Sequence, residues 1–562
     1  MVICLYIYIT CTDGRRFLMN RTRQIMKKTA ATALGISLVV SGSSSVFAAG
    51  SYQETEKAAL SRLTENLPQS WDAYLENYQK ASAGTNSSIT LQVEDTGRAL
   101  VGALMGGTDV SWLKTLSIDS NISIKDGIEA VVSSVLLNDG QICNFNVFMD
   151  LANMMEYIQI PELSDSYISA PISADSEDSD EETEQFMNTY MTVLSDLTSM
   201  LPDSKTVTTL LDRYGNIIID NTEEGASVEE SVSVDGISEN CTAYEGTVSE
   251  KAFTTMTESI LTTAKDDAEI KDLFAQWADA SDGEDQYQEF QNAIEDALKD
   301  VTSDEAGNEN TVFSSKVWVN ADDKIVGREI GIVDDTDVTP VFTWKAPSEG
   351  DSSALLLEVS ADDSSFTLTG SGKTADGVLN GDYILALDGT EAVDINVENL
   401  QTEPEKPGYY NGTFHLTFPE GTTEDDTDEE TSSDVNPLAG FGVDIKLISD
   451  ASSDISSLEL TLTTSGAPLA TLTVTGSYGD SIELPDLGAL TQTYDATDDN
   501  DMTGYFTEAN WDALLTNIKA AGVPEELAAQ LEEVLQAAVE SASQPEENDV
   551  ETNEEAAEDE AA

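Results

Sequence analysis

Apolar and polar residues alternate over most of the second half of the chain. From about residue 316, apolar side chains recur at every second position with Thr, Ser and Asp between them, as in Val393, Ile395 and Val397. This period of two is typical of strands with one buried and one solvated face. Many such strands without intervening helices predict antiparallel sheets, either curved and open or packed as a sandwich.

The first half of the chain mixes strand and helix patterns. Leu60, Leu63 and Leu67 recur at helical spacing, whereas residues 116–124 alternate as a strand does. Near the C-terminal end, residues 511–518 and a segment that begins at Pro524 predict a helical hairpin packed on the sheet. The predicted fold class is therefore α+β, with helices packed on antiparallel sheets and a β-rich C-terminal half.

These patterns divide the chain into consecutive regions. They are an upstream segment with a signal peptide (1–48), an N-terminal α+β region (49–173), an acidic linker (174–185), a mainly helical region with a hairpin (186–310), an antiparallel β region (311–490) with an acidic insert (422–434), a helical hairpin (491–540) and an acidic tail (541–562). The linker, insert and tail lack aromatic residues and carry clustered like charge, so we expect them to be disordered.

A segment near the start has the layout of a secretory signal peptide. Lys27 and Lys28 precede an apolar run over residues 30–40, and small residues end the segment at Ala48 and Ala49. The run is shorter than the roughly 20 apolar residues that span a bilayer. We expect cleavage after Ala48 or Ala49 and a secreted product. Retention at the cell envelope through an uncleaved N-terminal segment is the alternative.

Residues 1–18 fit no part of a signal peptide. Gly14, Arg15 and Arg16 can be encoded by a purine-rich ribosome-binding sequence shortly before Met19. This favours Met19 or Met26 over Met1 as the start of translation.

The charge balance is strongly acidic. Asp and Glu number 106 against 26 Lys and Arg, a formal net charge of −80. Nucleic acid and anionic lipid are held by basic residues, so we expect no nucleic-acid partner and no stable membrane insertion after signal cleavage. The charge favours solubility and loose binding of cations.

Two cysteines follow the signal segment, Cys143 and Cys241. Secretion permits a disulfide between them. Cys143, however, alternates with Phe145, Val147 and Met149 as a buried strand residue does, which favours two buried thiols. Two cysteines and one histidine do not make an ordinary structural zinc site.

The motif GSGKT at residues 370–374 raises the question of a phosphate-binding loop. Such a loop needs a glycine five positions before the second glycine, where this chain has Thr367. The following residues read as turn and strand, not as a helix. We therefore interpret GSGKT as a β-turn, and Asn380–Gly381 and Asn411–Gly412 as hairpin turns.

Candidate chemistry is sparse. His415, the only histidine, lies between Thr413 and Thr417 on the polar face of a strand, which predicts an exposed residue and argues against enzymes with a histidine base. Paired carboxylates, as in a glycan hydrolase, stay open because acids are abundant. We assign no catalytic or cofactor-binding residue.

One segment resembles a calcium-binding loop. A twelve-residue loop from Asp499 would place Gly504 at the sixth position, but its twelfth position is Asn510, where the pattern has Glu. We expect no specific metal site there and at most weak calcium binding.

The segments IPELSDSYI (160–168) and GISENCTAYEGTVSEKAF (236–253) resemble uncharacterised secreted or lipid-anchored proteins of Gram-positive anaerobes. Several of these look like distant relatives of the lipoprotein-carrier fold, a curved antiparallel sheet that cradles helices. The resemblance covers about residues 50–335 and implies a bacterial protein with a binding or structural role. The lipidation cysteine of the anchored members is missing here.

Three functions are open on these grounds. We favour a secreted, non-enzymatic binding module for an apolar or cell-wall-derived ligand. A structural role in assembly of the cell surface, with an envelope component as partner, is the second. An acid/base glycan hydrolase is the least favoured.

Deleting residues 174–185, 422–434 and 541–562 together should leave the melting temperature nearly unchanged. These segments bury too little apolar area to offset the entropy of ordering them. Thermal unfolding of the deletion variant measures the effect. A large drop in melting temperature would show that the segments pack on the folded regions.

Overall fold

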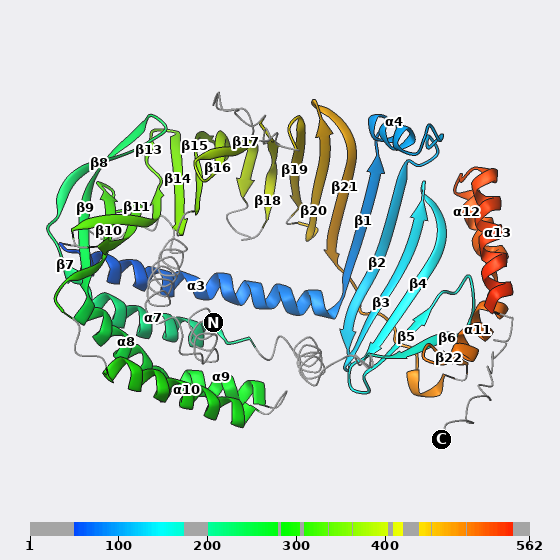
Figure 1. Ribbon diagram of the computed structural model, residues 1–562, viewed down its shortest axis with the longest axis horizontal. Coiled ribbons are helices and arrows are strands. Elements are labelled where there is room, and N and C mark those ends of the chain that lie inside the picture. Colours follow the sequence, from blue (N-terminus) through cyan, green and yellow to red (C-terminus); the bar gives the residue numbers. More distant parts are fainter. Residues whose placement is uncertain are drawn as a thin grey trace, which may run out of the picture.

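The computed structural model describes residues 50–172, 201–278, 283–303, 308–334, 336–361, 364–402, 409–419, 438–450, 452–490 and 492–542. Over these residues the chain is an α+β protein with one large, mostly antiparallel open sheet and helices near its C-terminal end (Figure 1). This confirms the predicted fold class and the β-rich C-terminal half. The predicted signal peptide, acidic linker and acidic insert, and the acidic tail beyond Ala542, lie outside the described residues.

A single sheet runs through most of the chain. Across the sheet the strands pair in the order β8 (Val228–Val234), β9 (Ile237–Ser249), β10 (Thr311–Asn320), β11 (Ile325–Asp334), β12 (Asp337–Lys345), β14 (Ser352–Ala361), β15 (Ser364–Ala375), β16 (Val378–Leu387), β17 (Thr390–Thr402), β18 (Tyr410–Thr417), β19 (Phe441–Asp450), β20 (Ile455–Thr464), β21 (Ala467–Tyr478), β1 (Thr85–Val93), β2 (Thr115–Lys125), β3 (Ile128–Leu137), β4 (Gly140–Asp150), β5 (Met155–Gln159), β6 (Tyr167–Pro171) and β22 (Thr493–Asp495). The short strands β7 (Glu223–Glu224) and β13 (Ser348–Glu349) pair with β9 and β14. Because β21 pairs with β1, the N-terminal α+β region and the later β region share one sheet.

Two-residue turns connect many neighbouring strands. Asp376–Gly377 joins β15 to β16 with φ angles of 52° and 80°, and Asp388–Gly389 joins β16 to β17 with 50° and 75°. Positive φ at both positions defines the type I′ turn, whose twist suits a hairpin. The prediction that Asn380–Gly381 and Asn411–Gly412 form such turns is wrong. Both lie inside strands, beside register shifts in the pairing with β17, and so belong to β-bulges.

Four helices pack together beside the sheet: α7 (Ser204–Asp220), α8 (Glu250–Lys265), α9 (Ala268–Ala278) and α10 (Gly283–Ser303). Their shared core includes Tyr214, Leu261, Phe290 and Ile294. The long helix α3 (Tyr52–Ala83) contacts α7 and continues past this cluster to the start of β1 (Figure 1).

The sheet rolls over on itself at its β8 end. There β8 contacts β12, β14 and β15. Ser348, next to β12, donates its backbone N–H to Glu239 Oε2 of β9 at 2.9 Å. The roll encloses an apolar core that includes Val232, Cys241 and Trp318.

A buried ion pair fixes the start of α3 to the rolled end. Arg328 of β11 donates to Glu56 of α3, and the two side chains are only 3% and 2% exposed. One helical turn earlier, Tyr52 donates its hydroxyl to Ser315 of β10 at 2.7 Å, and burial raises the pKa of Tyr52. Glu56 Oε2 and Arg328 Nη2 have no hydrogen-bond partner among the described residues. Each charge therefore depends on the other.

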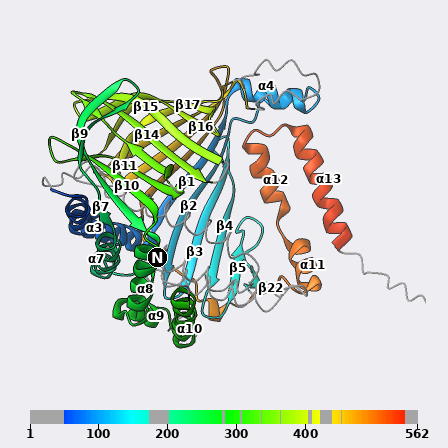
Figure 2. The same ribbon diagram turned by 60° about the vertical axis from the view of Figure 1, so that its left-hand side comes forward.

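The predicted C-terminal hairpin is confirmed. Helices α12 (Trp511–Ala520) and α13 (Glu525–Ala542) lie side by side, and α11 (Asp499–Glu508) precedes them (Figure 2). Asn517 Nδ2 donates to the carbonyl of Ile142 on β4 at 2.9 Å, outside the stretch that pairs with β5. The hairpin therefore covers part of an open strand edge. None of the described helices is long and apolar enough to cross a membrane.

The two cysteines are far apart in the sheet. Cys143 lies on β4 and Cys241 on β9, towards opposite ends, and both are free thiols. This confirms two free thiols over a bridge; Cys241 is buried as predicted, whereas Cys143 is only partly buried. Burial raises both pKa values, that of Cys241 to about 11.

The Glu56→Ala variant should lose about 3–5 kcal/mol of unfolding free energy, because it leaves the Arg328 charge buried and unpaired. Urea unfolding measures the loss. Lys57→Ala is the matched control, since it breaks an exposed pair with Asp220 and should cost no more than about 1 kcal/mol. Replacing both Glu56 and Arg328 by Met should restore most of the stability. Equal losses for Glu56→Ala and Lys57→Ala would contradict the importance of the buried pair.

Cys241 should resist alkylation by iodoacetamide in the native protein at pH 8. Its side chain is buried, and a pKa of about 11 leaves roughly one thiol in a thousand ionised. Peptide mass spectrometry, without reductant, should show both Cys143 and Cys241 alkylated after unfolding in urea. A disulfide-linked peptide pair would show that the thiols are not free.

Candidate functional site

The two faces of the sheet differ in polarity over its whole middle part. Rows of register partners carry apolar side chains on one side, which we call the apolar face. Its longest row crosses from β17 to β3 through Val397, Phe414, Ile445, Leu460, Leu472, Leu91, Leu116 and Leu137. A parallel row runs through Leu447, Leu458, Val474, Ile89, Ile118 and Val135.

The same face continues over β14 to β16. Here the register partners are Leu357, Leu368 and Leu385, with Val359, Phe366 and Leu387 beside them. At about 4.8 Å between neighbouring strands, the apolar face extends about 50 Å from β14 to β4. The alternation in residues 116–124 correctly predicted the β2 section of the apolar face. The side chains that share this side of β2 are Leu116, Ile118, Ile122 and Ile124.

Much of the apolar face is open to solvent. Ile89 is 42% exposed, Leu116 is 42% exposed and Leu387 is 50% exposed. Isolated exposed apolar residues are common on proteins, but a continuous row of them usually marks a binding surface. This row is the most prominent feature of the described residues that sequence reasoning did not assemble.

The opposite face is a solvated one. Short polar side chains bond across the strands, as in Thr461–Thr471 at 3.0 Å and Ser88–Asp119 at 2.6 Å. Such pairs suit contact with water, so the polar face needs no cover. The sheet is therefore amphipathic, and only its apolar face has side chains that remain to be shielded from water.

The described helices leave the middle of the apolar face uncovered. Their main contacts with the sheet are at β9, β21, β1, β2, β4 and β22. Helix α3 lies on the side of the apolar face at both ends. Its Glu56 meets Arg328, which is in register with Trp344 and Leu357, and its Lys80 Nζ lies 5.9 Å from the ring centre of Tyr478. Between these ends the strands arch over α3 (Figure 1).

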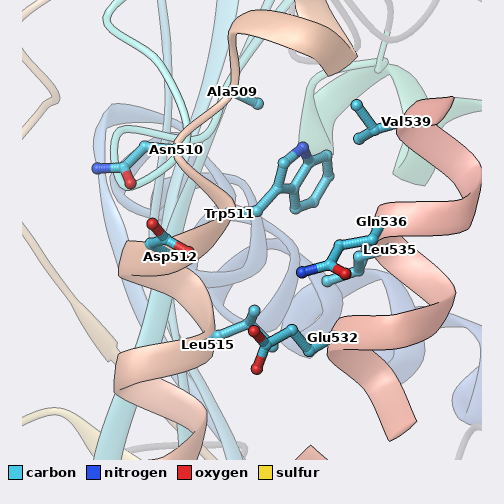
Figure 3. Close-up of a pocket in the computed structure, with 9 residues that line it drawn as sticks. All are labelled: Ala509, Asn510, Trp511, Asp512, Leu515, Glu532, Leu535, Gln536 and Val539. Atoms are coloured by element: carbon cyan, nitrogen blue, oxygen red, sulfur yellow. The ribbon is translucent and has the colours of Figure 1, made fainter. Parts of the chain in front are cut away.

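A second candidate is a pocket of about 360 Å³ in the C-terminal hairpin. Figure 3 shows Trp511 between α12 and α13, with Asp512, Glu532 and Gln536 around it. Trp511 Nε1 donates to the carbonyl of Phe506 at 2.9 Å, which fixes the indole. Lys519 donates to Glu532 at 3.3 Å, so one of the two carboxylates already has a partner. The pocket can hold a small ligand of mixed polarity.

The GSGKT motif lies inside strand β15, so its interpretation as a β-turn is wrong. The chain turns later, at Asp376–Gly377. A Cβ atom on Gly370 would lie 2.7 Å from the ring of Tyr383, and one on Gly372 would lie 3.1 Å from its hydroxyl. The glycines therefore make room for an aromatic ring of the next strand. Strand β16 follows the motif, where a phosphate loop has a helix.

His415 lies on the polar face, where the alternation placed it. Its Nδ1 is 2.7 Å from Asp444 Oδ1, and its Nε2 is 3.7 Å from Glu398 Oε2. Its register neighbours are Asn396 and Asp444, and neither carries a hydroxyl or thiol that a histidine base could activate. The arrangement is that of a polar ladder on a solvated face.

The segment from Asp499 does not form a loop. It is helix α11, and Asp498 caps that helix by accepting a hydrogen bond from the backbone N–H of Asn500 at 2.8 Å. In the described part of the chain, no group of three or more His, Cys, Asp or Glu side chains is placed to hold a metal ion.

We found no match to this chain among protein families, curated proteins or solved structures.

Proposed function

We propose that this protein is a secreted, non-enzymatic binding protein whose apolar face holds an elongated hydrocarbon-chain ligand. The observation that carries the proposal is the row of partly exposed apolar side chains across consecutive strands, opposite a polar face. Covering a face of this kind with an apolar ligand lowers the free energy, because apolar surface is removed from water. The secreted location rests on the sequence pattern alone.

The shape of the apolar face supports a long, thin ligand. It extends about 50 Å across the strands, at about 4.8 Å per strand, and its longest row carries only apolar side chains. An acyl chain gains about 0.8 kcal/mol for each methylene group that it buries. A chain of moderate length can therefore bind despite the cost of association.

The net charge of the protein restricts which lipid head groups the ligand can carry. With a net charge of −80, the long-range field disfavours anionic lipids. We therefore propose that the ligand carries a neutral or zwitterionic head group.

The hairpin pocket is better suited to binding a saccharide than to hydrolysing one. Trp511 offers a ring face, and Asn510 and Gln536 offer amides. Acid/base hydrolysis of a glycan needs two carboxylates with separate roles. Glu532 is engaged by Lys519, so the pocket lends little support to the hydrolase alternative.

Asn substitutions at Leu91 and Ile118 should each weaken binding of a pyrene-labelled monoacylglycerol by about tenfold, because each loses about 1.4 kcal/mol or more of apolar contact. Fluorescence titration measures the affinity. Ile384→Asn is the matched control: Ile384 is 39% exposed, close to 37% for Leu91, but lies on the polar face.

The control variant should bind the probe like the wild type. The proposal fails if the wild-type protein shows no saturable binding, or if Ile384→Asn weakens binding as much as the apolar-face variants do.

A further inference from the structure

Helix α4 (Asp95–Leu104) turns an uncharged surface outward at the end of β1 and the start of β21. Leu104 is 79% exposed, Met105 is 58% exposed and Leu100 is 46% exposed. Residues 99–108 contain no charged side chain, in a chain of which 23% is charged. We call the surface of Leu100, Leu104, Met105 and the adjoining Gly106–Gly107 the α4 tip.

Close packing fixes the orientation of α4. A Cβ atom on Gly97 would lie 2.1 Å from the carbonyl oxygen of Leu469, so this face of the helix sits directly on the start of β21. Glu94, just before the helix, donates its backbone N–H to the same carbonyl at 2.9 Å, and Arg98 bonds the carbonyl of Val93. These contacts anchor the first turn of α4, and beyond that turn the exposed fractions of Leu100, Leu104 and Met105 show that the apolar side chains of the tip are not packed on the sheet.

The α4 tip lies next to one end of the apolar face. Leu91 and Leu116 are register partners on that face and are 37% and 42% exposed. Strand β1 ends at Val93 and α4 begins at Asp95. An apolar molecule that leaves a surface touched by the tip has only a short distance to travel to the apolar face.

We propose that the α4 tip docks on the surface of a zwitterionic lipid bilayer, from which the apolar face takes its ligand; this inference rests on the function proposed above. A protein partner is disfavoured by size. A ten-residue helix is about 15 Å long, and a stable protein interface buries about 800 Å² on each partner. A few apolar side chains are enough for weak, reversible insertion at the level of the lipid head groups.

The charges around the tip favour a zwitterionic bilayer over an anionic one. The acidic residues in or beside α4 are Glu94, Asp95 and Asp109, and the basic ones are Arg98 and Lys114. Arg98 also pairs with Asp95. The surroundings thus lack the cluster of basic residues that holds anionic lipid.

Flotation of the secreted protein with phosphatidylcholine vesicles tests the proposal. The double variant Leu104→Glu/Met105→Glu should reduce the vesicle-bound fraction by about tenfold, since it places two charges at the lipid contact. Val534→Glu on α13 is the matched control, because Val534 is 64% exposed and lies on the C-terminal hairpin. It should float like the wild type.

A gain-of-function variant guards against misfolding of the double variant. Leu104→Trp should bind vesicles more tightly than the wild type and shift its fluorescence to the blue when vesicles are added. Circular dichroism and melting temperature confirm folding for each variant.

The readouts separate this proposal from the proposed function. If the double variant keeps its affinity for the soluble monoacylglycerol probe but takes lipid from vesicles more slowly, docking is supported. If the wild type does not float, or the double variant floats equally well, docking is overturned while probe binding still decides the function of the apolar face. A change in oligomeric state of the double variant by light scattering would show a self-association surface and would overturn docking too.

Discussion

The strands from β14 to β4 carry most of their apolar side chains on the same side of the sheet, and this common polarity constrains the rest of the structure. The side-chain period of a strand is two, so a slip of one residue at any pair would place a polar row among the leucines. Tight turns such as Asp376–Gly377 hold neighbouring strands in register. Once the register is shared, the apolar rows add into one surface that no single strand presents. The main contacts of the described helices with the sheet lie at β9 and from β21 to β22.

Apolar side chains are enclosed at the rolled end of the sheet, whereas many of them stay exposed in its middle. At the rolled end, β8 folds over β12 and β14, and the start of α3 covers the other side. Arg328 is buried there, on the side of the apolar face, and Glu56 makes that position tolerable. A buried pair of this kind adds little net stability, but a shift of α3 away from it would leave one charge buried and unpaired. With that end of α3 fixed and its other end continuous with β1, the helix runs beneath the arched strands from the rolled end to β1 (Figure 1).

The sequence predicted individual elements better than their assembly. Alternation correctly placed Leu116 and Ile118 on one side of β2, and helical spacing found the hairpin of α12 and α13. Pairing of β21 with β1 joins segments distant in sequence, and local patterns carry no information about such a contact. GSGKT was misread because glycine serves turns and also strand positions beneath an aromatic ring, and only the position of Tyr383 distinguishes the two. The Asp-Gly dipeptides were the better turn signal. The apolar face was out of reach because exposure depends on what the helices leave uncovered.

The strong net charge of the chain opposes the self-association that an open apolar face would otherwise promote. A large exposed apolar surface normally promotes association between copies of a chain. Here each copy carries a formal net charge of −80, and copies that approach each other repel. The polar face, rich in Thr, Ser and Asp side chains, adds little apolar area on the other side. Strong charge elsewhere thus lets the chain keep an apolar face open without covering it permanently, and an uncharged ligand is the partner that this repulsion does not exclude.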